Sequence, residues 1–363
     1  MEAIHEHYLD NAATTMVCAE AAAAAADAML RCYGNPSSTH TKGREAKKLL
    51  DKCRKQVADA LGCAPAEAYF TSCGSESDNW ALLSGAEYMK RRGKHIISST
   101  VEHDAIRKSL DELEKRGFEV TRLKPDASGA IPVQSVVDAL RDDTILVSLM
   151  MVNNETGAVT DISAISRELK RAGSQALLHT DAVQGFMKVP FRAKTLGADM
   201  ISISGHKIHA PKGIGALYMR AGTEAMPQIA AFGAASEIAY AGMKENIARM
   251  SALRERAVSR LERDIPELRV ISSADSAPHI LSISLPGWRS EVLMNYLEAR
   301  GVYVSRSSAC KKGGRSHVLE AVGLDAKTID GAIRVGLSRL TTEEDIDALC
   351  DALRDAHDTL AHR

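Results

Sequence analysis

The sequence predicts an α/β protein with a large domain, built on a mostly parallel sheet between helices, and a smaller α+β domain at the C-terminal end. Short apolar runs, which are typical of buried strands, alternate with amphipathic stretches through the first two thirds of the 363 residues. Strands that alternate with helices in this way form parallel sheets that helices cover on both faces. The apolar fraction of 45% is ordinary for a globular protein with a sizeable core.

The elements of the large domain follow from these two patterns. The apolar runs that predict strands are 95–100, 145–152, 176–183, 200–205 and 215–219. The amphipathic stretches that predict helices are 43–61, 104–116, 133–141 and 161–172. The alanine-rich run 21–26 also predicts a helix, because alanine has the highest helix propensity. Ligands of such sheets bind beyond the carboxyl ends of the strands, so the residues that follow each strand are the candidates for a site.

The pattern changes near residue 234. A long helical stretch runs to about 264, and the later segments alternate between apolar strands and helices. The strand candidates are 279–286 and 302–310, and the helix candidates are 291–300 and a final helix from 342. We therefore place the large domain at 15–245 and the small domain at 246–363, with the N-terminal residues 1–14 joining the small domain.

Composition excludes several classes of protein. The formal net charge of -1 argues against a nucleic-acid-binding surface. We find no apolar run of the roughly 18–20 residues that a membrane span needs and no signal peptide at the start, so we expect a cytoplasmic protein. The seven cysteines are scattered without a CxxC pair, which favours reduced thiols over disulfides or a metal site.

Lys207 follows one predicted strand, and Asp181 lies at the end of another. A lysine directly after a buried strand is either a solvated strand-end charge or an amine partly desolvated for Schiff-base chemistry. Asp181 is either a helix N-cap or a carboxylate that keeps a pyridine nitrogen protonated, as the cofactor pyridoxal 5'-phosphate (PLP) requires. Gln184, three residues on, would face the same cavity if a helix begins there.

Three more polar clusters come at strand ends. Gly74 and Ser75 open a helix after the strand AYF, and such an N-terminus binds anions through its backbone N–H groups. His103 and Asn154 follow two further strands. Each cluster alone is compatible with a helix cap or a structural hydrogen bond, but five clusters at successive strand ends indicate one site.

Nine motifs, in this order, resemble the cysteine desulfurases of the NifS/IscS-like family, in the class V branch of the fold-type-I PLP-dependent transferases. They are YLDNAATT, GNPSSTH, FTSCGSESDN, VEHDAI, VNNETGAV, HTDAVQ, SGHKIHAPKGIGALY, SRSSAC and IRVGLSRLTTEEDID. The resemblance extends from about residue 8 to residue 356. It implies the fold-type-I fold, PLP as the cofactor and L-cysteine as the substrate.

The resemblance also implies a role for each matching residue. Lys207 would bond PLP as a Schiff base, Asp181 would pair with the ring nitrogen and His103 would stack on the ring. Asn154 and Gln184 would bind the phenolic oxygen, and Arg334, assisted by Asn35, the substrate carboxylate. The phosphate would be held by Gly74, Ser75, Ser204 and His206, and by Thr223 from the partner subunit of a homodimer with shared active sites.

Cys310, in the SSAC motif, would be the sulfur-accepting nucleophile. It lies in a polar, glycine-containing stretch, SRSSACKKGGRSH, which predicts an exposed loop. The neighbouring Lys311, Lys312 and Arg315 would favour the thiolate. The implied reaction converts L-cysteine to L-alanine and leaves the sulfur on Cys310 as a persulfide. The persulfide would then pass to a sulfur-acceptor protein of iron–sulfur cluster assembly, or of thio-cofactor or tRNA synthesis.

One segment departs from the family's pattern. Between Met219 and Thr223 the chain lacks most of a longer glycine-rich connection, which is either a true deletion or a segment left out of the sequence. Two alternative functions stay open at this point. A selenocysteine lyase or another class V enzyme shares the Lys207 chemistry, and a catalytically degenerate PLP-fold scaffold would share only the fold.

Overall fold

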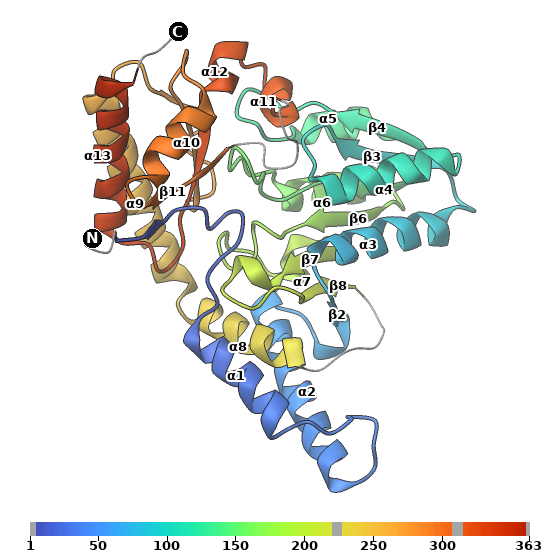
Figure 1. Ribbon diagram of the computed structural model, residues 1–363. Helices are drawn as coiled ribbons and strands as arrows, with labels where there is room; N and C mark the ends of the chain where they lie inside the picture. Colours follow the sequence, from blue (N-terminus) through green and yellow to red (C-terminus); the bar gives the residue numbers. More distant parts are fainter. Residues whose placement is uncertain (1–4, 220–226, 307–314, 361–363) are drawn as a thin grey trace.

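A computed structural model describes residues 5–219, 227–306 and 315–360 of the chain (Figure 1). The predicted residues Thr223 and Cys310 therefore lie outside the described residues. Two layered units with separate hydrophobic cores are seen, and a pair of long helices, α1 and α2, extends from the larger one. No helix of the described part of the chain is long and apolar enough to cross a membrane.

The larger unit is built on a seven-stranded sheet in the order β2-β8-β7-β6-β5-β3-β4. Its strands are β2 (Ala68–Thr71), β3 (His95–Ser99), β4 (Glu119–Leu123), β5 (Thr144–Ser148), β6 (Leu177–Asp181), β7 (Met200–Ser204) and β8 (Gly215–Tyr218). The five strands from β7 to β4 run parallel, whereas β8 is antiparallel to both β7 and β2. The five predicted strands of this domain are confirmed, and the mostly parallel sheet with them.

Helices cover both faces of this sheet. They are α1 (Ala19–Leu30), α2 (Thr41–Leu61), α3 (Gly74–Met89), α4 (Asp104–Lys115), α5 (Val133–Asp138), α6 (Ile162–Arg171), α7 (Ala193–Leu196) and α8 (Pro227–Ala241), with the short 3₁₀ helices η1 (Pro65–Glu67) and η2 (Gly205–Lys207). Successive strand residues point to opposite faces, so Ile96 packs in the cluster under α3 and α4 while Ile97 packs in the larger cluster on the other face. A sheet covered on both faces explains the near-continuous apolar runs of the sequence.

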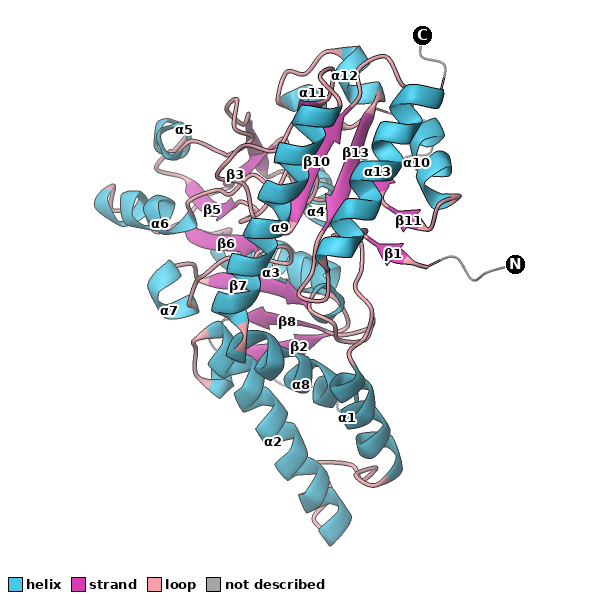
Figure 2. Cartoon of the chain, turned by 90° about the vertical axis from the view of Figure 1, so that its left-hand side faces the viewer, coloured by secondary structure: helices cyan, strands magenta, loops and turns pink. Residues whose placement is uncertain are grey.

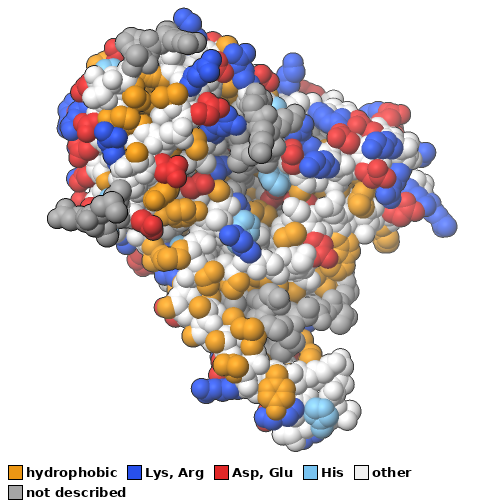
Figure 3. Space-filling model, viewed as in Figure 1, with side chains coloured by type: hydrophobic (Ala, Val, Ile, Leu, Met, Phe, Trp, Pro, Cys, Tyr) orange, Lys and Arg blue, Asp and Glu red, His pale blue; other side chains and the backbone are white. Residues whose placement is uncertain are grey.

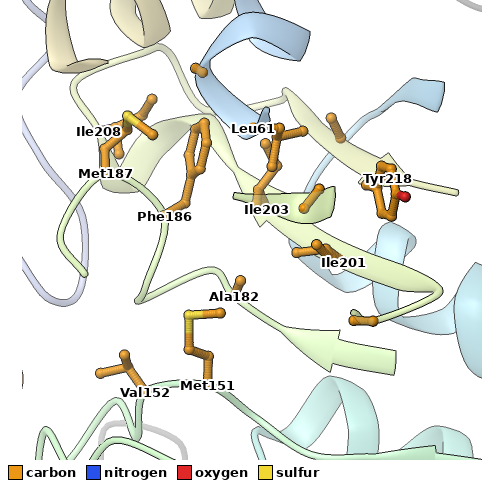
Figure 4. Packing of buried hydrophobic residues seen from close by; sticks show 14 of the residues in the cluster. Leu61, Met151, Val152, Ala182, Phe186, Met187, Ile201, Ile203, Ile208 and Tyr218 are labelled. Carbon is orange, nitrogen blue, oxygen red and sulfur yellow. The ribbon is translucent and has the colours of Figure 1, made fainter. Parts of the chain in front are cut away.

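The larger of these clusters supports the segments that carry the site. Phe186 and Met187 follow β6, Ile208 follows β7, and they pack with Leu61 of α2 and Ile203 of β7 (Figure 4). Phe186 also meets the ring of Phe232 edge-on, at 6.4 Å between ring centroids. The chain that leaves β6 and β7 is thereby held against a rigid apolar layer.

The smaller unit contains an antiparallel sheet in the order β12-β13-β10-β9, against which two long helices, α9 and α13, lie (Figure 2). Its elements are α9 (Met243–Asp264), β9 (Arg269–Val270), β10 (Ile280–Ser284), α10 (Ser290–Glu298), β11 (Val302–Tyr303), β12 (Ser305–Arg306), α11 (His317–Ala321), α12 (Ala326–Asp330), β13 (Ala332–Gly336) and α13 (Glu343–Thr359). The N-terminal strand β1 (His7–Tyr8) pairs with β11.

Three details differ from the sequence prediction or stay untested. The single long helix expected before residue 264 is two helices, because the chain breaks at Gly242 between α8 and α9. The strand expected at 302–310 is interrupted after Tyr303, and its last four residues lie outside the described residues. The domain boundary at 245/246 falls within α9 and stays a prediction.

Candidate active site

Ten of the residues singled out in the sequence line one cavity of about 320 Å³. They come from the strand ends of the large sheet, from the start of α3 and from the small sheet: Gly74, Ser75, His103, Asn154, Asp181, Gln184, Ser204, His206, Lys207 and Arg334. The carboxyl ends of β3, β5, β6 and β7 meet at one edge of the sheet, which explains why residues more than a hundred positions apart converge. β13 supplies Arg334 from the opposite side.

Lys207 is half-buried in η2, directly after β7. Its Nζ donates hydrogen bonds to the carbonyl oxygens of Ala12 and Ala13, both at 2.7 Å. Gln184 holds the same segment, since its Nε2 donates to the Ala12 carbonyl at 2.8 Å. The Lys207 amine is thus directed to the cavity wall formed by the N-terminal segment.

Asp181 ends β6 and is 6% exposed. Its Oδ1 accepts a hydrogen bond from the backbone N–H of Val183 at 2.9 Å. Burial raises the pKa of the Asp181 carboxyl, and the nearby His103 and Lys207 oppose that rise. A cationic ring nitrogen would find its counter-ion here.

The start of α3 has the form of an anion cradle. Gly74 is the first helical residue, and a Cβ at that position would lie 2.7 Å from Cγ2 of Val183, so a side chain there would displace its neighbour. The backbone N–H groups of this first turn and the hydroxyl of Ser75 lie at the cavity. The Ser204 hydroxyl is buried there without a hydrogen-bond partner in the described part of the chain, as a group awaiting a ligand oxygen would be.

His206 and His103 add ring nitrogens to the cavity lining. Nδ1 of His206 lies 3.1 Å from Oγ1 of Thr14. Burial lowers the pKa of His206 to about 4, with Lys207 contributing, so this ring is neutral at physiological pH. His103 is the N-cap of α4, where its Nδ1 accepts from the N–H of Ala105 at 3.2 Å.

Arg334 is only 3% exposed and reaches from the small sheet to the large domain. Its Nη1 donates to the Asn154 carbonyl at 2.7 Å, and its Nη2 donates to Ser305 Oγ at 2.9 Å and to Asp10 Oδ1 at 3.2 Å. Its Nε is buried and has no hydrogen-bond partner among the described residues. A guanidinium in a cavity wall is suited to binding a carboxylate.

Asn35, the remaining predicted site residue in the described part of the chain, is not among the residues that line this cavity. It is exposed in the loop between α1 and α2, where its side chain accepts from the N–H of Ser37 at 2.9 Å. This loop lies at the far end of the two helices, away from the sheet (Figure 1).

Sequence reasoning assigned no role to several polar groups of the site. Asp78 and Glu155 line the cavity, and Asp10 pairs with Arg334. Glu102 is buried behind the cavity beside Met150. All four belong to motifs that the sequence analysis quoted, so their position next to functional residues was a usable signal. Their burial could not be predicted from the sequence, because it depends on how the helices and strands pack.

The residues present fit PLP. The unpartnered hydroxyl of Ser204 and the helix start at Gly74 suit a phosphate, a lysine amine lies in the same cavity, and Asp181 offers a carboxylate for a ring nitrogen. These are the three anchoring points that the cofactor needs.

Comparisons with known proteins agree with this assembly. The family model described as aminotransferase class-V matches residues 7–221 and 219–349. The chain is 42% identical to cysteine desulfurase 2 of Trichormus variabilis, over 94% of this chain and 90% of that protein. A solved structure described as a NifS-like protein superposes with a TM-score of 0.92 at 34% identity, covering 98% of this chain and all of the other. SspA, solved in complex with cysteine, gives a TM-score of 0.77 at 28% identity, over 93% of this chain and all of SspA.

Proposed function

The chain belongs to the aminotransferase class-V family, and we propose that its cysteine desulfurase reaction takes place in the cavity around Lys207, with PLP as cofactor. The observation that carries this proposal is the convergence of Lys207, Asp181 and Arg334 on one cavity with an anion cradle. Each of the three would serve a different part of the chemistry: the amine, the ring nitrogen and the substrate carboxylate.

The residues of this chain would share the binding of PLP. Lys207 would carry the cofactor through its amine, and Asp181 would pair with the ring nitrogen. His103 would stack on the ring, while Asn154 and Gln184 would bind its phenolic oxygen. The phosphate would be held by Gly74, Ser75, Ser204 and His206. When bound, PLP supplies an electron sink for the carbon next to the amino group of the substrate.

Arg334 would orient L-cysteine through its carboxylate, because its guanidinium group belongs to the cavity lining. Lys207, once its amine is free, would remove the proton from the substrate Cα, because a neutral amine in a partly buried cavity is a competent base. Nζ would keep contact with the cavity wall through the carbonyls of Ala12 and Ala13.

Cys310 would take the sulfur. Its thiolate would attack the sulfur of the substrate and form an S–S bond, while the C–S bond of the substrate breaks and its electron pair stays with the carbon fragment. Protonation of that fragment gives L-alanine, and the persulfide on Cys310 passes to a sulfur-acceptor protein. The position of Cys310 in the SSAC motif supports this assignment.

We further propose that the enzyme is a homodimer. Large apolar side chains are exposed on α1 and beside it: Met16 (66%), Met29 (58%), Leu30 (76%) and Tyr33 (69%). Hydrophobic side chains gather over this lower part of the molecule in the space-filling view (Figure 3). Exposed apolar side chains that gather on one part of a surface are typical of a protein–protein interface. Thr223 of the partner subunit would complete the phosphate site.

An absorbance spectrum of the purified protein, taken before and after L-cysteine is added, tests the proposal, with alanine and sulfide assayed in the same tube. A visible cofactor band that shifts with L-cysteine, with equal amounts of alanine and sulfide under a reductant, is the expected result. A band without alanine would point to another amino-acid substrate. A protein that takes up no PLP would be a scaffold.

A further inference from the structure

The turn 153–157, between β5 and α6, joins the two halves of the molecule at the cavity wall. Its backbone is held from inside by the Asn153 side chain, which accepts from the N–H groups of Glu155 and Thr156, both at 2.9 Å. Four donors from beyond residue 270 bind the outside of the turn. They are Arg334 to the Asn154 carbonyl, Ser272 to the Thr156 carbonyl, Ala277 to the Gly157 carbonyl and Ser316 to the Glu155 carboxylate.

Glu155 is the residue of this turn that the proposed reaction leaves without a role. It is 5% exposed and lines the same cavity as Lys207 and Arg334. Its Oε2 accepts a hydrogen bond from Oγ of Ser316, which is itself buried and caps α11 by accepting from the N–H of Leu319 at 3.1 Å. Among the described residues this carboxyl has one neutral donor and no ion pair, so its charge is free to change.

The charged groups around Glu155 come from several elements. Arg334 on β13 and Arg107 on α4 favour the carboxylate, whereas Asp104 on α4 disfavours it. Lys207, His103 and Asp181 lie in the same cavity lining, and Asp10 is paired with Arg334. Burial outweighs the two arginines and raises the pKa of Glu155 to about 7. Glu155 therefore changes charge within the working pH range.

We propose that Glu155 is a positioning residue of the desulfurase site, which sets through its own charge how strongly Arg334 binds the carboxylate of the substrate. The inference rests on the proposed function of Arg334. Asp10 already gives this guanidinium one anionic partner, at 3.2 Å. Ionised Glu155 adds a second negative charge and weakens the attraction for a third carboxylate, while protonated Glu155 leaves that attraction intact. Substrate binding is accordingly tighter below the pKa of Glu155 than above it.

The test compares the PLP-loaded wild type with Glu155→Gln, which stays neutral and still accepts the hydrogen bond from Ser316. The probe is 3-mercaptopropionate, which has the thiol and carboxylate of cysteine but no amino group with which to bond to PLP. Its Kd is measured by calorimetry at pH 5.5 and 8.5. We expect equal Kd values at pH 5.5 and a Kd about three- to tenfold lower for the variant at pH 8.5. Dividing the Kd of the wild type by the Kd of the variant cancels the effect of every titrating group that the two proteins share.

A second pair of variants tests the link to Ser316. The hydrogen bond from Ser316 lowers the pKa of Glu155, so Ser316→Ala moves the midpoint of the pH dependence of Kd to higher pH. Ser316→Thr, which keeps a hydroxyl for both the carboxylate and the helix cap, restores the wild-type midpoint. A purely structural contact would alter stability in the alanine variant without moving that midpoint.

The outcomes separate this inference from the proposed function. If the ratio of the wild-type Kd to the Glu155→Gln Kd is the same at both pH values, the charge of Glu155 does not affect binding at Arg334. The inference is then overturned. If Arg334→Lys binds 3-mercaptopropionate as tightly as the wild type, Arg334 is not the carboxylate site and the proposed function itself is at fault. Different variants thus report on the two ideas.

Discussion

The buried carboxyl of Glu102 makes the stability of this protein depend on pH in an unusual direction. Glu102 is 1% exposed behind the cavity, and its Oε1 accepts from Ser99 Oγ at 2.5 Å and from the Met150 N–H at 3.1 Å. Its Oε2 is buried without a hydrogen-bond partner among the described residues. Burial raises the pKa of Glu102 to about 8, and Asp181 adds to the rise.

The sign of the effect follows from proton binding. An unfolded glutamate ionises near pH ~4.3. Between that value and about 8 the folded state therefore holds one more proton than the unfolded state, so the free energy of unfolding falls as pH rises through this window. The limiting slope is about 1.4 kcal/mol per pH unit. From pH 5.5 to 7.5, we expect the wild type to lose about 2–3 kcal/mol relative to Glu102→Gln, which cannot ionise.

Thermal unfolding of the PLP-loaded proteins measures this difference. For a chain of this length the change corresponds to roughly 2–5 °C in the relative Tm. The control is Glu87→Gln, which removes an exposed carboxylate paired with Lys90 and should track the wild type across the range. Parallel Tm curves for wild type and Glu102→Gln would refute the reasoning, because they would mean that the folded protein binds no extra proton at Glu102.

Three further predictions concern the site. Cys310→Ala should keep the PLP absorbance but form no persulfide, and sulfide release at the wild-type rate would exclude Cys310 as the nucleophile. Gly74→Ala should weaken PLP binding at least about tenfold, since its Cβ would meet Val183 Cγ2 at 2.7 Å, and unchanged retention of PLP on dialysis would contradict the cradle. Arg334→Lys should raise the KM for L-cysteine about tenfold with a smaller change in kcat, because a lysine lacks the planar fork, and an unchanged KM would place the substrate carboxylate elsewhere.

Most of the large sheet could be predicted because its strands are buried on both faces and therefore read as apolar runs. The strand β4 was not predicted, because it is not buried on both faces. Its sequence, EVTRL, is at the edge of the sheet, where four of its five residues are partly exposed and one fully, so no apolar run marks it. Gly242, where the predicted long helix breaks, is a residue that often ends helices, but an isolated glycine is also tolerated within a helical pattern, so it did not by itself mark a boundary.

The site residues that could be predicted are those at the ends of predicted strands. Strand ends converge in a parallel sheet, so Asp181 and Lys207 were expected together. Asn35 shows the limit, because its motif stands in the expected order but its loop lies at the end of a helical pair that extends from the sheet. Glu155 shows a second limit of the prediction, since its burial depends on the packing of α11 against a turn of the other domain.

Three buried carboxyls, Glu102, Asp78 and Asp181, interact with one another beside the cavity, and burial disfavours the charge of each. Glu102 is neutral below pH 8. Asp78 is fully buried, with its Oδ1 3.7 Å from the ring of His179, and burial together with Asp181 raises its pKa well above the usual value. His179 offers it no cation, because burial lowers the pKa of that ring to about 3. Asp181 has the N–H of Val183 and the nearby His103 and Lys207 to favour its charge. Of these three carboxyls, Asp181 is therefore the one best placed to carry the charge that a protonated ring nitrogen would need.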